Sequence, residues 1–212
     1  MRMKRKIPSF SKRRISSGYI LYLIGSGCIV IGILLGAIIA NHVNEIQQKE
    51  LLQYLESFFS QFPTTFVSSK QVLKNVLFKN GKLLLWIWGM GFLTIGIFFA
   101  CGALFLKGLV YGFTSTFLFV QYGWNGLFFG FISFLPQNLI FIPMFIFVAK
   151  YSMQWSVGHY QQKQMRARWH REQKQKWIEY GLVLAIGLAC IVLGSVIETY
   201  FTPILMRALL SK

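Results

Sequence analysis

Long apolar stretches alternate with short polar ones along this chain. Between Lys82 and Lys150 the sequence runs 67 residues with a single charged residue, Lys107. A surface helix of a soluble protein alternates polar and apolar positions because one face meets water, whereas this block is apolar on all sides. About 20 residues cross the hydrocarbon core as a helix, so the block has room for about three crossings. The pattern therefore predicts a multi-span membrane protein.

The same pattern predicts an all-α fold with about five transmembrane helices in one membrane domain covering residues 1–212. We expect the helices at 19–40, 83–106, 108–120, 124–149 and 177–205. Lys107 and the turn residues at 121–125 mark the predicted boundaries of the third. That segment is only 13 residues long. It is therefore expected either to cross or to form a re-entrant hairpin, which must be buried in protein.

The polar region 41–82 is long enough for two amphipathic helices on the outer face of the membrane. In the first, apolar residues recur at helical spacing: Leu51, Leu55, Phe58 and Phe62. In the second, Ser68 and Gln71 have the spacing of a capping box, and Asn80-Gly81 is a stop signal. These helices are expected either to pack on their own domain or to provide a docking surface for a partner.

The basic residues predict the orientation. The chain has 22 Lys and Arg against 6 acidic residues. The arm 1–18 has seven basic residues and no acid, the loop 150–176 has seven and one, and the region 41–82 has five and three. Loops rich in Lys and Arg stay in the cytoplasm, so we expect the N-terminus and the second loop inside and the C-terminus outside. Orientation accounts for the charge better than nucleic acid, and anionic lipid headgroups are the favoured contact.

The sequence offers little catalytic chemistry. There is no Asp, and the three histidines lie in the polar segments. No histidine is thus placed to activate a nucleophile within the membrane. The three cysteines lie in apolar segments without metal-binding spacing. We therefore expect no catalytic residue, no metal and no cofactor, and a protein that is not an enzyme.

Small residues at helical spacing predict close helix packing. Gly32 and Gly36 form a GxxxG motif in the first span. Such motifs let two helix backbones approach closely in lipid. The motif is expected either to pack within the domain or to contact a partner span, and self-association is one form of the second alternative.

Two polar insertions lie within the last two predicted spans. Pro136, Gln137 and Asn138 interrupt the fourth, and Glu198 precedes Pro203 in the fifth. An ionisable group at membrane depth usually faces the bundle or a wet cavity. Glu198 is expected to be either a solvated carboxylate at the interface or a partly buried group that pairs with Gln137 or Asn138.

Three segments carry a resemblance to a known family. KGLVYGFTSTFLF (Lys107–Phe119), GLFFGFISFLPQNLIFIPMFIF (Gly126–Phe147) and IETYFTP (Ile197–Pro203) resemble the core of the stage II sporulation protein M family. The five-span plan, the basic arm and the length are also similar to that family. Broader relatives carry a PHG-then-acid pattern near Leu135–Asn138, and its absence here favours the sporulation branch.

The resemblance implies a membrane scaffold in endospore formation. Such a protein would sit in the cell membrane, at the septal and engulfing membrane during sporulation. It would recruit two peptidoglycan hydrolases, stage II sporulation proteins D and P, for septal wall thinning and forespore engulfment. The alternative is a permease or transporter subunit, whose path would be lined by polar residues at depth.

Overall fold

The computed structural model describes residues 10–61, 69–162, 170–202 and 204, and this part of the chain is helical and has no strand. Within these described ranges, three segments are long and apolar enough to cross a membrane: Gly18–Asn41, Gly96–Val157 and Lys176–Phe201. The predicted all-α class with membrane-spanning helices is therefore confirmed. Phe62 and Pro203, both predicted to matter, lie outside the described residues.

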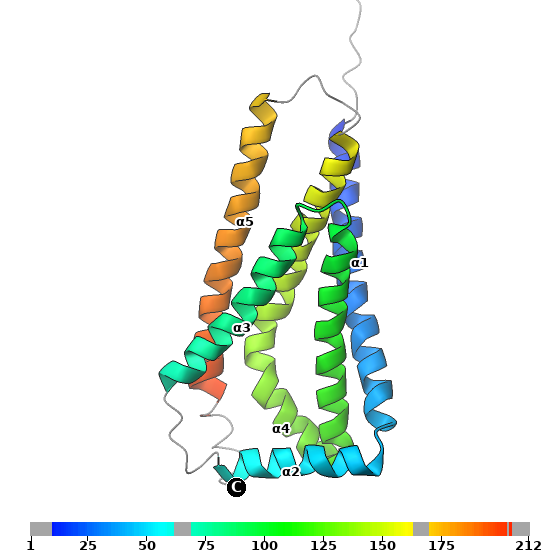
Figure 1. Cartoon of the computed structure of the whole chain (residues 1–212), viewed down its shortest axis with the longest axis vertical. Helices are drawn as coiled ribbons and strands as arrows, with labels where there is room; N and C mark the ends of the chain where they lie inside the picture. Colours follow the sequence, from blue (N-terminus) through cyan, green and yellow to red (C-terminus); the bar gives the residue numbers. More distant parts are fainter. Residues whose placement is uncertain (1–9, 62–68, 163–169, 203, 205–212) are drawn as a thin grey trace, which may run out of the picture.

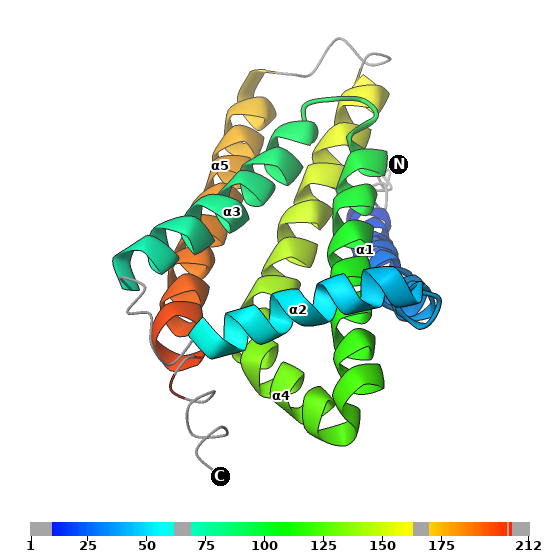
Figure 2. The ribbon, with the colours of Figure 1, turned by 60° about the horizontal axis from the view of Figure 1, so that its bottom comes forward.

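The helices form a bundle with one helix across its end. In chain order they are α1 (Phe10–Asn41), α2 (Glu45–Gln61), α3 (Ser69–Met90), α4 (Gly96–Gln162), α5 (His170–Val196) and the π-helix η1 (Ile197–Phe201). Figure 1 shows α1, α3, α4 and α5 running lengthwise, with α2 across the end opposite the start of α1. When that end is turned forward, α2 extends from the end of α1 toward η1 (Figure 2).

α4 is a hairpin rather than one rod. Its 67 residues include Gly123 at φ 61° and ψ −146°, a conformation outside the helical region. Residues other than glycine rarely adopt a positive φ, so glycine suits this position. The leg 96–122 runs toward the α2 end of the bundle, and the leg 124–162 returns (Figure 1). The chain reverses within the turn that the sequence predicts at 121–125.

The predicted spans 83–106 and 108–120 do not match the helices. α3 ends at Met90, and α4 begins at Gly96 and continues through Lys107. The boundary between two helices thus lies at 91–95, twelve or more residues before Lys107. A Cβ on Gly91 would collide with Tyr180, and one on Gly96 with the carbonyl of Met90, so both glycines permit this tight turn. The predicted stop at Asn80-Gly81 is also wrong, because both residues lie inside α3.

Two serines of the returning leg bind the end of α3 and the turn that follows it. The hydroxyl of Ser156 donates to the carbonyls of Leu93 at 2.7 Å and Thr94 at 3.0 Å. The hydroxyl of Ser152 donates to the carbonyl of Ile87 at 2.7 Å. Buried backbone carbonyls outside a regular helix need such partners. These bonds explain how a turn can lie inside an apolar block.

Large apolar side chains fill the space between α3, α4 and α5. Leu84, Ile87, Leu104 and Val148 are completely buried. Many other apolar side chains point outward, among them Phe98 at 78% exposure and Leu139 at 71%. An apolar exterior around a packed interior is typical of a membrane bundle, whose outer surface meets lipid.

The helices extend past the other predicted boundaries. α1 begins at Phe10 rather than 19, α4 continues to Gln162 rather than ending at 149, and α5 begins at His170 rather than 177. The predicted basic loop 150–176 is therefore partly helical. In the predicted outer loop 41–82, α2 is a separate helix, whereas the second amphipathic piece is the beginning of α3.

Candidate functional site

Glycines on α1 and α4 bring these helices into backbone contact. A Cβ on Gly32 would collide with the carbonyl of Phe105, and one on Gly36 with the carbonyl of Leu109. In return, Gly108 and Gly112 of α4 pack on the carbonyls of Ile29 and Ile33. Gly32 and Gly36 thus pack within the domain, which was one of the two alternatives. The matching Gly108-xxx-Gly112 was missed, although its spacing is plain in the sequence.

Lys107 lies in the middle of the first leg of α4 and faces the bundle. Its ammonium donates to the side-chain oxygen of Asn80 on α3 at 3.2 Å and to the hydroxyl of Tyr111 at 3.5 Å. It also lies 4.9 Å from the ring centre of Phe145 on the returning leg. A buried ammonium needs such partners because it has lost its water. Lys107 therefore ties α3 to both legs of α4.

Glu198 approaches the same cluster from the π-helix. Its side chain is half-buried and interacts electrostatically with Lys107 and Lys79. π-helical turns within α-helices are frequent at functional sites. We name Asn80, Lys107, Tyr111 and Glu198 the polar cluster. It contains two of the predicted candidate residues, Lys107 and Glu198, which lie 91 positions apart. It joins them with Tyr111, which the sequence analysis did not name, and with Asn80, which it named only as a helix stop.

Gln137 pairs with a different residue of the last span than predicted. Its side-chain oxygen accepts a hydrogen bond from the hydroxyl of Thr202 at 2.9 Å, and both residues are buried. Thr202 lies four positions after Glu198, so the predicted contact between these spans exists with a shifted register. Asn138 and Pro136 are half-buried. Pro136 and Pro143 lie inside the returning leg, which bends visibly (Figure 1).

Two further hydroxyls lie beside the polar cluster along the chain. In the described part of the structure, the oxygens of Ser195 and Thr199 are buried without a hydrogen-bond partner. Both residues flank Glu198 on α5 and η1. Buried polar atoms are normally paired, and unpaired ones indicate strain or an absent water or ligand. The end of α5 and η1 therefore place two unpaired hydroxyls close to Glu198 along the chain.

An aromatic cluster packs α3, α4 and α5 together at the end of the bundle away from α2. The sequence did not predict this cluster. The ring of Tyr180 on α5 stacks on Trp88 of α3 at 4.9 Å and on Trp155 of α4 at 4.6 Å. The indole of Trp88 donates to the carbonyl of Tyr180 at 3.1 Å, and the hydroxyl of Tyr180 donates to the carbonyl of Trp88. Phe92 and Trp177 complete the stack. Such rings suit a membrane interface, where one end meets lipid and the other water.

The apolar face of α2 is only partly described. Leu51 lines a cavity of about 500 Å³ together with Ile39 in the last turn of α1, Val43 just after α1, and Phe113 of α4. That part of α2 therefore faces its own domain. Leu55 and Phe58 lie in α2, but their side chains are outside the described residues.

The arrangement can hold helices together through polar bonds inside an apolar bundle. Among the described residues, no three His, Cys, Asp or Glu side chains gather where a metal could bind. The expectations of no metal, no cofactor and no catalytic residue stay predictions. So do the lipid contact, the absence of nucleic acid as a partner, and self-association.

The comparison with protein families gives one match. The model of the family described as stage II sporulation protein M matches residues 26–203, which include the polar cluster, the glycine contact and Gln137. No curated protein and no solved structure matches the chain significantly.

Proposed function

Because this chain belongs to the stage II sporulation protein M family, we propose that it is a non-enzymatic membrane scaffold for endospore formation. It recruits peptidoglycan hydrolases, stage II sporulation proteins D and P, to the septal membrane. There they thin the septal wall and permit engulfment of the forespore. The family match over 26–203 is the observation that carries this proposal, and the membrane-spanning helices support it.

The proposal includes five crossings. α1, α3, the two legs of α4 and α5 run alternately toward and away from the α2 end (Figure 1). α3 is the least apolar of these segments. It is also held by contacts inside the bundle, where its residues Leu84 and Ile87 are fully buried. The N-terminus lies in the cytoplasm, while α2, the turn at Gly123 and η1 lie at the outer face, where hydrolases act on the wall.

A transporter or permease subunit is the second candidate function. The polar cluster and the unpaired hydroxyls of Ser195 and Thr199 are the observations that favour it. Polar groups at membrane depth often mark a substrate or ion pathway. In this case Glu198 and Lys107 would serve transport rather than helix packing.

Localisation of the hydrolases separates the two functions. Deletion of this protein in a spore-forming host should disperse fluorescent fusions of both hydrolases from the septum, while the purified hydrolases keep full activity. The purified protein alone should release no muropeptides from cell-wall sacculi. Release of muropeptides would overturn the scaffold proposal. The transporter function would be favoured by one phenotype of a Glu198→Gln strain. In it, the protein is present at normal levels and the hydrolases are at the septum, yet engulfment fails.

A further inference from the structure

Topology does not account for the lysines at the start of α3. Its first 14 residues contain Lys70, Lys74, Lys79 and Lys82, and the whole helix has no acidic residue. In the proposed orientation, on which this inference rests, that end lies at the outer face. An excess of lysine is expected at the cytoplasmic face instead. Lys79 interacts with Glu198, whereas Lys70 and Lys74 face elsewhere.

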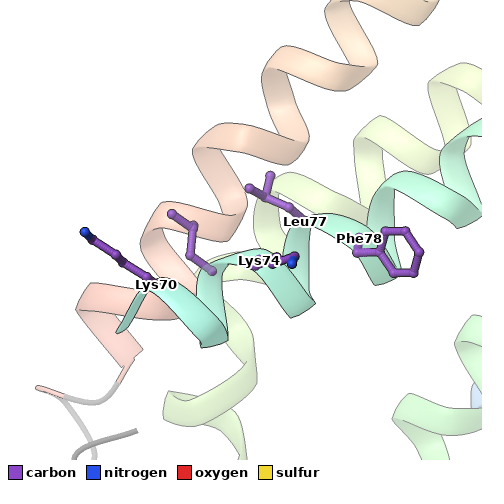
Figure 3. A pocket seen from close by; sticks show the side chains of 5 residues that line it. Lys70, Lys74, Leu77 and Phe78 are labelled. Atoms are coloured by element: carbon purple, nitrogen blue, oxygen red, sulfur yellow. The ribbon is translucent and has the colours of Figure 1, made fainter. Parts of the chain in front are cut away.

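These two lysines border a shallow, open groove along one face of α3, and its floor is apolar. Lys70 and Lys74 lie one helical turn apart and line a cavity of about 450 Å³ with Leu73, Leu77 and Phe78 (Figure 3). Leu73 and Leu77 are half-buried, and the ring of Phe78 is 64% exposed. The ammonium of Lys82 lies 4.5 Å from the centre of that ring, so a third cation lies near the groove.

We propose that this groove binds one anionic phospholipid. Its phosphate lies between the ammonium groups of Lys70 and Lys74, and its acyl chain covers Leu73, Leu77 and Phe78. The combination of an anion and an adjoining hydrocarbon chain matches the cations and the apolar floor of the groove. A water-soluble phosphate would leave the floor exposed. Farther along α3, Leu85 and Trp86 are 50% and 44% exposed, so the apolar surface continues toward the bilayer core.

The charges predict the size of the effect. Each lysine near an anionic membrane surface strengthens binding by about fivefold. Lys70→Gln/Lys74→Gln should therefore weaken the bound lipid by roughly 30-fold. Lys49→Gln on α2 removes an exposed charge outside the groove and is the matched control for Lys74→Gln. Phe78→Ala tests the floor without changing any charge.

The test is native mass spectrometry of the full chain in detergent, titrated with palmitoyl-oleoyl phosphatidylglycerol or with phosphatidylcholine of the same chains. The wild type should retain one phosphatidylglycerol more tightly than phosphatidylcholine. Lys74→Gln, the double variant and Phe78→Ala should weaken it, and Lys49→Gln should not. Inorganic phosphate at millimolar concentration should leave the lipid bound. The unfolding temperature of each variant shows that it is folded.

Four results would overturn the inference. Equal retention of the two lipids, or equal weakening by Lys49→Gln, would leave only nonspecific charge attraction. Displacement by inorganic phosphate would make the groove an anion site without a lipid chain. Unchanged lipid binding in the double variant with loss of hydrolase co-purification would make the groove a protein-docking surface. The scaffold proposal is judged separately, since hydrolase localisation in the deletion strain does not depend on this groove.

Discussion

Gly36→Ala should lower the free energy of unfolding, whereas Gly27→Ala should leave it unchanged or raise it. A Cβ on Gly36 collides with backbone of α4, while one on Gly27 meets no atom within 4 Å. Where no such collision occurs, alanine in a helix interior is more stable than glycine by about 0.5–1 kcal/mol. Forcing a methyl group into a packed interface costs about 1–3 kcal/mol. The two substitutions in the same helix should therefore have opposite signs.

The measurement is unfolding of the purified protein in mixed micelles, with Gly112→Ala and Gly102→Ala as the corresponding pair on α4. Gly112 packs on Ile33, and Gly102 has open space around its Cβ position. Equal changes in the unfolding free energy within each pair would contradict the backbone contact.

Lys107→Met should be the most destabilising substitution in the polar cluster. It removes the hydrogen bonds to Asn80 and Tyr111 and leaves Glu198 without its nearby buried cation. A hydrogen bond to a charged group contributes about 1.5–3 kcal/mol, so we expect a loss of that order. Lys49→Met, at an exposed position of α2, should change the stability by less than about 0.5 kcal/mol.

A double-mutant cycle distinguishes a coupled pair from two independent losses. Glu198→Gln added to Lys107→Met should recover part of the lost stability, because the remaining group no longer carries a charge. Contacting residues typically show interaction energies of about 0.5–3 kcal/mol. Strictly additive changes in the unfolding free energy would show that Lys107 and Glu198 do not act together.

The sequence allows the membrane class and the last hairpin to be predicted, because these depend on local composition. Gly123 is a turn residue between apolar runs, and the structure reverses there. The turn at 91–95 is different, because its carbonyls at Leu93 and Thr94 accept hydrogen bonds from Ser156, about 60 residues away. Hydropathy does not reveal a turn whose partners come from a distant helix.

The error at Lys107 has a related cause. A lone charge in an apolar block suggests a boundary, because an unpaired ammonium is costly in lipid. Here the partners are Asn80, which precedes it by 27 positions, and Glu198, which follows it by 91. The sequence indicated Lys107, Glu198 and Gln137 individually, but which residues meet depends on the register between helices. For Gln137 that register differs by one helical turn from the expected one.

The five crossings underlie both the scaffold and the lipid site, and cysteine labelling of intact protoplasts tests them directly. In a background without the three native cysteines, single cysteines replace Gln53 on α2, Asn125 after the α4 turn, Thr94 between α3 and α4, and Gln162 at the end of α4. A membrane-impermeant maleimide should label the first two in intact protoplasts. It should label Thr94→Cys and Gln162→Cys only after permeabilisation. Labelling of Thr94→Cys in intact protoplasts would show that α3 does not cross, and would contradict the account.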